Sequence, residues 1–236
     1  MPLLEETLDK EKAKLGPDHP STLTTMSNLA ATYLYGGQLA KAVPLFEQAL
    51  EKQRAKLGPD HPSTLTTMSN LALVYRDSGQ LARAVSLLEE TLAKRKATLG
   101  AEHPETLGAM ASLGMFLLRQ KKWTDAEPLL RDCLAIRQKQ IPVSWLTFNT
   151  QSLLGGALLG QKRYAEAEPL LVKGYEGMKT REKTIPQYGG GERIPEALDR
   201  LIELYTATNK PDEANKWQAE RAKFPQGGKT KTQEKK

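Results

Sequence analysis

Several residue types are scarce in this sequence, and each scarcity excludes a class of protein. The 236 residues include a single cysteine, Cys133, so the chain cannot form an internal disulfide. No apolar run approaches the roughly 20 residues that a membrane-spanning helix needs. The first residues, Met1-Pro-Leu-Leu-Glu-Glu, carry acids where a secretory signal would carry basic residues and an apolar stretch. We therefore expect a cytoplasmic protein that has no membrane partner.

Positive charge is in excess, but the excess is concentrated at one end. The formal net charge is +6, and residues 226–236 supply +3 of it through four lysines and one glutamate. Residues 225–236 are too polar to build a core, which predicts a disordered basic tail. The rest of the chain is close to balanced. This distribution argues against a nucleic-acid partner, because binding to phosphates requires a basic surface.

What the sequence does contain is an internal repeat. Residues 15–30, Leu-Gly-Pro-Asp-His-Pro-Ser-Thr-Leu-Thr-Thr-Met-Ser-Asn-Leu-Ala, recur unchanged as residues 57–72, which is 42 positions later. An altered third copy begins at Leu99. A fixed period of this size indicates a solenoid of stacked units, each of which needs its neighbours to bury its apolar face.

Each unit holds two helical patterns. In the first unit, apolar residues at helical spacing predict helices over about 20–35 and 39–57. Gly36-Gly37 breaks the chain between them, and Gly58-Pro59 ends the second helix. The sequence therefore predicts an all-α fold of stacked antiparallel helix pairs.

The repeat also sets the expected organisation of the chain. It predicts an array over residues 1–180, a Gly-containing loop over 181–193, a capping helix pair over 194–224 and the tail over 225–236. Within the array we expect a half repeat over 1–15 and then repeats over about 16–57, 58–99, 100–140 and 141–180.

The half repeat lacks its first helix, which leaves two interpretations. Either the chain is part of a longer array, or Leu3, Leu4 and Leu8 pack on something outside it. The second interpretation includes self-association through this uncapped N-terminal end.

The spacing of small and large residues resembles the tetratricopeptide repeat. The pattern small–x₁₁–Ala–x₃–large is met by Ala30, Ala42 and Phe46, and again by Ala72, Ala84 and Leu88. The long period, with Leu-Gly-x-x-His-Pro-x-Thr-Leu before Asn-Leu-Ala, is similar to the subtype found in kinesin light chains and bacterial repeat arrays. The resemblance implies a right-handed α-solenoid whose inner groove is lined by the first helix of each pair and binds peptide segments of other proteins.

No constellation of side chains suited to catalysis emerges. The histidines, His19, His61 and His103, share one repeat position. Packed helices stand about 8–10 Å apart, too far for these rings to meet one ion at about 2.1 Å. We interpret them as cap residues before a proline, with zinc binding as the alternative. Cys133 occupies a small packing position, and Gly189-Gly-Gly191 lacks the lysine of a phosphate loop. We expect no enzyme activity, no metal and no cofactor.

The first helices of the pairs are nearly free of charge. Residues 20–35 and 142–160 contain no charged side chain, and the methionines at 26, 68 and 110 fall on the apolar stripe. A neutral lining lacks the arginine clusters that hold acidic or phosphorylated motifs. It suits an extended polypeptide, because asparagine both donates and accepts hydrogen bonds. The candidate peptide-binding residues are Thr24, Ser27, Asn28, Thr66, Ser69, Asn70, Arg76 and Arg119.

These observations predict a non-catalytic protein–protein interaction scaffold that binds an extended peptide segment in a neutral polar groove. In the sharper form of the hypothesis, Asn28 and Asn70 form a two-rung ladder that holds the peptide. The alternative for these side chains is that they bond only within the array. The alternative for the whole chain is a truncated C-terminal array of a larger signalling protein, with a structural role alone.

Overall fold

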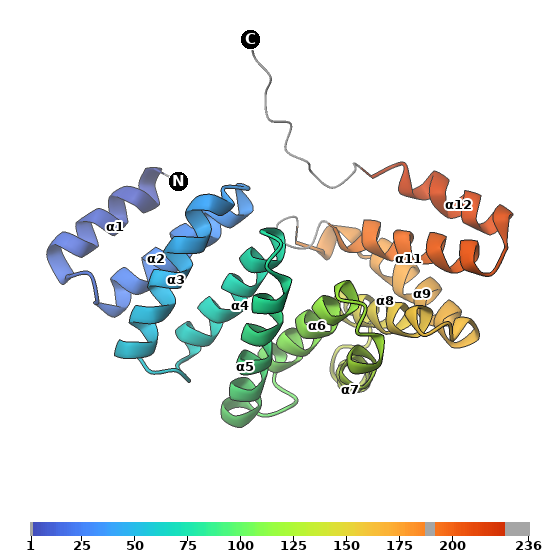
Figure 1. The fold of residues 1–236 in the computed structure, drawn as a ribbon, viewed down its shortest axis with the longest axis horizontal. Helices are drawn as coiled ribbons and strands as arrows, with labels where there is room; N and C mark the ends of the chain where they lie inside the picture. The colour runs from blue at the N-terminus through green and yellow to red at the C-terminus, as the bar shows by residue number, and fades with distance from the viewer. Residues whose placement is uncertain (1, 187–191, 225–236) are drawn as a thin grey trace, which may run out of the picture. The chain divides into compact units, whose positions relative to one another are not determined.

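The computed structural model describes residues 2–186 and 192–224, which form eleven α-helices and one short 3-10 helix (Figure 1). Residues 187–191 of the predicted loop and the predicted tail, 225–236, lie outside the described residues. The part of the chain that is described contains no β-strand. The prediction of an all-α fold is therefore confirmed.

The chain divides into two compact units, residues 1–116 and 117–236. Unit 1 holds α1 (Pro2–Leu15), α2 (Pro20–Tyr35), α3 (Leu39–Lys56), α4 (Pro62–Asp77), α5 (Leu81–Leu99) and most of α6 (Pro104–Arg119). Unit 2 holds the end of α6, α7 (Trp123–Gln140), α8 (Trp145–Gly160), α9 (Tyr164–Lys179), η1 (Glu182–Thr184), α11 (Arg193–Ala207) and α12 (Pro211–Arg221).

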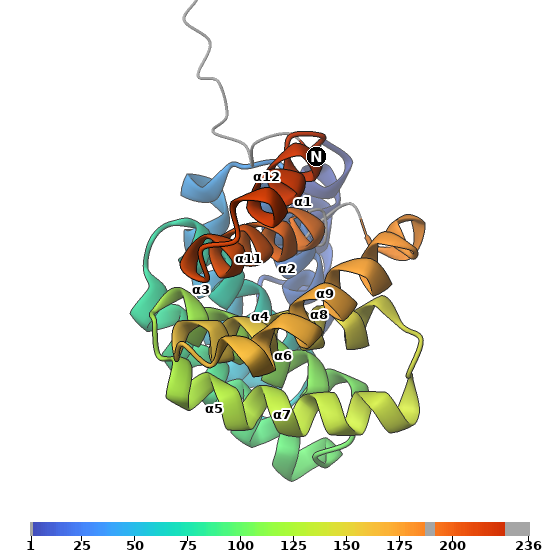
Figure 2. The same ribbon diagram turned by 90° about the vertical axis from the view of Figure 1, so that its right-hand side faces the viewer.

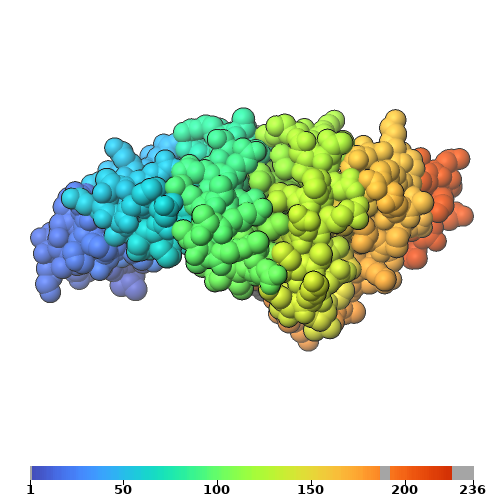
Figure 3. Space-filling model, turned by 90° about the horizontal axis from the view of Figure 1, so that it is seen from below, coloured from blue at the N-terminus to red at the C-terminus, as the bar shows by residue number. Residues whose placement is uncertain are grey.

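Unit 1 is built from helical hairpins whose members pack against each other and against the next hairpin. α2 lies against α3, α4 lies against α5, and α3 also contacts α4. Ala30 and Ala42 are both fully buried, as is Phe46 one turn further along α3. The small side chains of the two alanines let α2 and α3 approach closely. On the face shown in Figure 3, the side chains of neighbouring helices within this unit are in contact.

The apolar stripes of the first helices form the core, as the sequence predicts. Met26, Met68 and Met110 are 1%, 0% and 2% exposed. Their placement confirms that these methionines are core residues. Since methionine is unbranched and adaptable, it suits irregular space in such a core.

In unit 2, α8 is enclosed by its neighbours. It packs on α7, α9 and α11, and every residue from Asn149 to Leu159 is buried. Figures 1 and 2 show α9 lying alongside α8. The two helices approach closely because α9 carries Gly174 and Gly177 where they meet. A Cβ added at Gly174 would stand 2.7 Å from the backbone nitrogen of Ser152. Enclosure on several sides explains why α8 carries no charge.

The turn inside each hairpin requires a left-handed residue. Gly37 and Gly79 have φ of +71° and +79° in unit 1. The corresponding positions in unit 2 are Lys121 and Lys162, with φ of 59° and 60°. Glycine adopts this conformation without strain, whereas a Cβ makes it costly. The turn geometry is thus retained in unit 2 with a less suitable residue.

Two buried arginines fasten a second helix of a pair to the start of the next first helix. Arg95 is 7% exposed and donates to the backbone oxygen of Glu105 at 3.1 Å. Arg137 is 3% exposed and donates to the backbone oxygen of Leu146 at 3.0 Å and to Thr150 Oγ1 at 2.7 Å. Burial lowers the pKa of both guanidinium groups. Each bond gives a carbonyl in the first turn of the next helix a further donor and so ties that helix to the preceding one.

The N-terminal helix differs in part from expectation. Leu8 is 4% exposed and packs within unit 1, so it is not left for an outside partner. Leu4 is half-buried, and Leu3 is 75% exposed. The expectation of self-association through this end of the chain therefore depends on Leu3. None of the helices in the described ranges has the length and apolarity that crossing a bilayer demands.

Candidate functional site

The polar residues predicted to bind a peptide lie on the first helices of two hairpins in unit 1. α2 carries Thr24 and Asn28, both exposed. α4 carries Thr66, which is exposed, and Ser69 and Asn70, which are half-buried. α2 and α4 contact each other directly. The structure thus places these five side chains on neighbouring helices of one unit.

Ser27 is the member of the predicted set that does not reach the surface. It is 9% exposed, and its hydroxyl oxygen lies 3.0 Å from Thr67 Oγ1 on α4. It also donates to the backbone oxygen of Leu23 and accepts a bond from Gln53 Nε2 at 3.2 Å. Ser27 joins α2 to its neighbours inside the unit, so we leave it out of the binding surface.

The hydroxyl groups of the remaining residues are partly engaged with their own helices. Thr24 Oγ1 donates to the backbone oxygen of Pro20 at 2.9 Å, and Ser69 Oγ donates to that of Leu65 at 3.0 Å. A hydroxyl that donates in this way keeps its lone pairs as acceptors. Thr24 and Ser69 can therefore accept hydrogen bonds from a ligand but are poor donors to it.

The two asparagines are different, because their amides are not used inside the unit. The side chains of Asn28 and Asn70 form no hydrogen bond with any other residue among those described. Asparagine is not favoured in the middle of a helix, yet it stands there at the same position of two consecutive repeats. Each amide offers two donors and one acceptor oxygen.

Arg76 is held at the end of α4. Its guanidinium pairs with Asp77 at 2.6 Å and stands over the ring of Phe116, 5.8 Å from the ring centre. Its side chain is 12% exposed. Arg76 is thus packed among neighbours and contributes less surface than the asparagines do.

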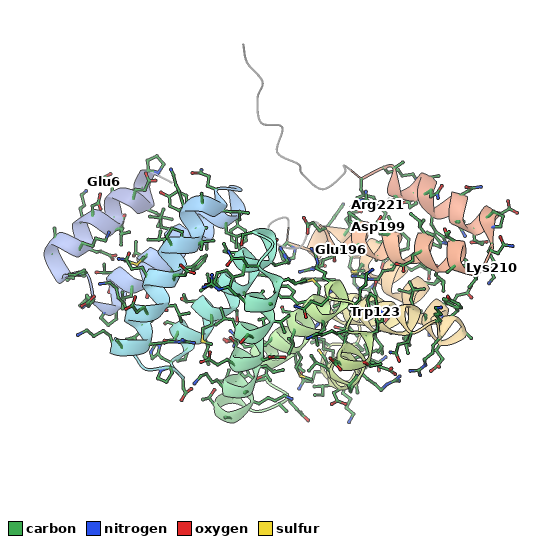
Figure 4. The ribbon with its side chains drawn as sticks, viewed as in Figure 1. Glu6, Trp123, Glu196, Asp199, Lys210 and Arg221 are labelled. Carbon is green, nitrogen blue, oxygen red and sulfur yellow. The ribbon has the colours of Figure 1, made fainter. Side chains whose placement is uncertain are left out.

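Arg119 belongs to a cluster of charges in unit 2 that the sequence analysis did not anticipate. It donates to Glu196 Oε1 on α11 at 2.7 Å. Arg193 and Arg200, on the same helix, lie 3.5 and 3.6 Å from Glu196 Oε2. Figure 4 shows Glu196 with Asp199 one turn further along α11. The expectation that no arginine cluster is present was wrong for this unit.

A sequence signal for this cluster exists. Residues 193, 196 and 200 stand at i, i+3 and i+7, so they share one face of α11. Arg119 is far from them in sequence, and only packing brings it to that face. Burial raises the pKa of Glu196, but Arg200, Arg193 and Arg119 together lower it, and the net shift is downward. Glu196 is therefore an ionised carboxylate among three guanidinium groups.

The other singled-out residues have structural roles. His19 and His61 precede α2 and α4 as cap residues, and their Nδ1 atoms accept the backbone N–H of Ser21 at 3.2 Å and of Ser63 at 3.1 Å. His103 does the same at the start of α6. Cys133 is fully buried, and burial raises the pKa of its thiol. The cap and packing interpretations are confirmed.

A hollow of about 590 Å³ also lies between α2 and α3. Tyr33 and Pro44 are among its lining residues, and the ammonium of Lys41 stands 5.1 Å from the centre of the Tyr33 ring. None of the predicted binding residues lines it. The hollow is therefore separate from the surface that carries Asn28 and Asn70.

Comparison with known proteins places the chain among repeat proteins. A family profile described as tetratricopeptide repeat matches residues 2–55, 36–97, 69–139 and 105–180. The fold is similar to a crystal structure of kinesin light chain nearly identical TPR-like repeats from Podosopora anserina. That structure is 28% identical, with a TM-score of 0.69 over 87% of this chain and 95% of that chain. No curated protein sequence matches the chain.

Two more distant structures share the fold. BtubC (BKLC) from P. vanneervenii is 17% identical, with a TM-score of 0.67 over 99% of both chains. MamA 41-end from Desulfovibrio magneticus RS-1 is 15% identical, with a TM-score of 0.57 over 86% of this chain and 94% of that chain. At these identities the likeness concerns the fold alone.

Proposed function

This chain belongs to the tetratricopeptide-repeat family, and we propose that it is a non-catalytic scaffold that binds an extended segment of a partner protein through Asn28 and Asn70. The observation that carries the proposal is the state of these two amides, which bond to no other described residue. Tetratricopeptide repeats are in general protein-interaction scaffolds, and this supports the class of function.

The spacing of the two helices suits an extended ligand. α2 and α4 are direct neighbours, and packed helices stand about 8–10 Å apart. Two residues of an extended chain span about 7 Å and three span about 10 Å. Asn28 and Asn70 can therefore bond to peptide groups two or three residues apart on one partner segment.

The neighbouring side chains fit the same ligand. Thr24, Thr66 and Ser69 accept hydrogen bonds, and α2 contains no charged residue. Such a surface binds backbone groups without selecting side-chain charge. We infer from this that unit 1 recognises the extended conformation of its partner more than its sequence.

The test is a binding measurement with an asparagine double variant. Partners are first captured by crosslinking and mass spectrometry, and the crosslinked segment is then made as a labelled peptide. We expect Asn28→Ala with Asn70→Ala to weaken binding about tenfold or more, since each lost hydrogen bond contributes about 0.5–1.5 kcal/mol. Asn215→Ala, an exposed asparagine on α12, is the matched control and should leave the affinity unchanged.

Two results would count against the proposal. Equal affinity of the double variant and the wild type would show that the amides do not hold the ligand. Failure to recover any partner segment that crosslinks to α2 or α4 would favour the alternative, a structural segment of a larger signalling protein.

A further inference from the structure

The loop between α7 and α8 in unit 2 differs from the loops that precede α2, α4 and α6. Each of those three loops carries an acid directly before its cap histidine: Asp18, Asp60 and Glu102. Asp60, for example, pairs with Lys94 of α5 at 2.7 Å. In the α7–α8 loop, residues 141–144 read Ile-Pro-Val-Ser and contain no acid. An apolar tip thus stands where the other loops have a charged one.

The tip of the α7–α8 loop is exposed as well as apolar. Val143 is 67% exposed and Ile141 is 36% exposed, with the exposed Pro142 between them. Ile141 holds the repeat position of Leu15 and Leu99, which are exposed to a similar degree. The change specific to this loop is therefore the addition of Pro142 and Val143. Single exposed apolar residues are ordinary, whereas three in a row indicate a contact with another apolar surface.

The backbone of this tip has few free donors. The backbone nitrogen of Ile141 donates to Arg137 at 2.8 Å, and that of Ser144 donates to the oxygen of Ile141 at 3.0 Å. Thr147 Oγ1 donates to the same oxygen at 2.7 Å. Pro142 has no N–H to satisfy. A segment whose polar groups are bonded within the protein enters surroundings with little water at a lower cost.

Cationic side chains flank the tip. Lys139 is exposed in the last turn of α7, two residues before Ile141. Arg181 follows the end of α9, and its guanidinium stands 4.7 Å from the centre of the Phe148 ring at the start of α8. Lys183 is exposed in η1. Figure 2 shows the α7–α8 loop and the end of α9 at the same edge of unit 2.

These cations are not neutralised within the part of the chain that is described. Lys139, Arg181 and Lys183 form no ion pair with any described residue. Glu182, the acid beside them in sequence, pairs instead with Lys179 at 2.9 Å. The loop therefore combines an apolar tip with about three positive charges, counting one per group.

This combination fits a membrane surface better than a peptide. Apolar side chains enter the boundary between headgroups and acyl chains, and Lys or Arg residues beside them are attracted to anionic headgroups. A peptide ligand needs a groove or a free strand edge, and an exposed loop tip offers neither.

We propose that the α7–α8 loop attaches the protein to the surface of an anionic bilayer. Residues 141–143 enter the headgroup boundary, and the three flanking cations bind the headgroups. A contact of this kind needs no membrane-spanning segment, so the proposal departs from the sequence-based expectation of no membrane partner. It is independent of the proposed peptide binding, because the loop belongs to unit 2 and the two asparagines belong to unit 1.

The test is co-sedimentation of the full chain with two kinds of vesicle. One is phosphatidylcholine alone, and the other contains about 30% phosphatidylserine, which supplies the anionic surface. We expect the protein to sediment with the phosphatidylserine vesicles and to remain largely unbound with phosphatidylcholine alone. Binding should weaken as salt is added, because the attraction of the cations is screened.

One pair of variants tests the apolar tip. Val143→Asp restores the acid that the other loops carry and should weaken binding to the phosphatidylserine vesicles at least tenfold. Leu3→Asp is the matched control, since it places the same charge on a side chain of unit 1 that is 75% exposed, and it should bind as the wild type does. Both positions are exposed, and circular dichroism checks that each variant is folded.

A second variant tests the cations. Lys139→Gln together with Lys183→Gln should weaken binding at least tenfold, because each Lys or Arg near an anionic surface contributes about fivefold. Asn28→Ala together with Asn70→Ala should bind the vesicles as the wild type does, whatever its effect on a peptide partner. The two proposals can therefore fail separately.

Three results would overturn the membrane contact. The first is no sedimentation with phosphatidylserine vesicles at low salt, which would favour a protein as the partner of this loop. The second is an equal loss of binding in Leu3→Asp. The third is undiminished binding of Val143→Asp: the four lysines of residues 226–236 are present in every variant, so this result would show that they bind the vesicles without the loop.

Discussion

The hydroxyl oxygens of Ser27 on α2 and Thr67 on α4 lie 3.0 Å apart in the interior of unit 1, although the two residues are 40 positions apart in sequence. Gln53 Nε2 donates to the same serine oxygen at 3.2 Å. Removing that oxygen takes the partner from the buried Thr67 hydroxyl and leaves Gln53 Nε2 only a 3.5 Å contact with the backbone oxygen of Leu23. Such a loss typically costs about 1–3 kcal/mol. We expect Ser27→Ala to lower the free energy of unfolding by this amount, as measured by urea denaturation.

The matched control is one repeat further along. Ser69 occupies the same repeat position, but it is half-buried and donates within its own helix to Leu65. The residue that would face it is Ala109, which has no hydroxyl. Ser69→Ala should therefore change stability by less than about 0.5 kcal/mol. Similar losses for both variants would contradict the role assigned to Ser27.

The contact between α8 and α9 depends on a missing side chain. A Cβ at Gly174 would stand 2.7 Å from the nitrogen of Ser152 and 2.9 Å from the backbone oxygen of Phe148. Because both are backbone atoms of α8, the helices must separate to accommodate it. We expect Gly174→Ala to destabilise the fold by about 1–3 kcal/mol. Gly108→Ala, in α6, meets nothing within 4 Å and should stabilise it by up to about 1 kcal/mol.

The left-handed lysines offer a stabilising change. Lys121 and Lys162 have φ of 59° and 60°, a conformation that costs a residue with a Cβ about 1–2 kcal/mol. Glycine removes that cost. It also gives the unfolded chain more conformational freedom, which offsets part of the gain in stability. We expect Lys121→Gly and Lys162→Gly each to raise stability by about 0.5–1 kcal/mol in thermal unfolding. Alanine at the same positions keeps the Cβ and should give no gain, so a gain with alanine would show that charge, not conformation, is responsible.

Glu127 gives the fold a defined sensitivity to acid. Hydrogen bonds from Arg131, Gln161 and Arg163 lower the pKa of its carboxyl from 4.5 to about 2, against the effect of burial. Because the pKa is lower in the folded protein, the carboxylate stabilises the fold above about pH 4.5, and this contribution is lost as the pH falls to about 2. After allowance for solvent screening, we expect the contribution to be about 1–2 kcal/mol.

The measurement is urea unfolding of the wild type and of Glu127→Gln from pH 7 to pH 2. The stability difference between them should be largest at neutral pH and should vanish near pH 2. Glu203→Gln, an exposed carboxylate of α11 without an ion pair among the described residues, should follow the wild type throughout. A difference that stays constant across this range would exclude titration of Glu127 as its cause.

Local features of the fold could be predicted from sequence because they depend on neighbours in the chain. The apolar spacing around Met26 and the His-Pro pairs fixed the helices and their caps without knowledge of packing. The role of Ser27 could not be predicted in this way, since its partner Thr67 is identified only once α2 and α4 are packed together. Spacing within one helix does not show which polar residue faces a neighbouring helix.

The arginine cluster was missed for a related physical reason. It joins Arg119 to α11, a helix of the last hairpin, where the sequence repeat has faded and positions no longer correspond from unit to unit. Charge counted along single first helices suggested a neutral surface. Packing brings the charges of α6 and α11 together, so their combined charge can be assessed only when the contact between the two helices is known.

The pairing of Ser27 with Thr67 also bears on how such a chain can grow. If residues 57–98 were duplicated in tandem, Ser69 would face a copied threonine in place of Ala109. Arg95 would meet the carbonyl of a copied serine but would lose the carboxylate of Glu105, which lies 3.2 Å from its guanidinium group now. Recombination between the identical segments would therefore add a whole hairpin with the buried hydroxyl pair restored, while the new junction would keep the hydrogen bond of Arg95 and lose its ion pair.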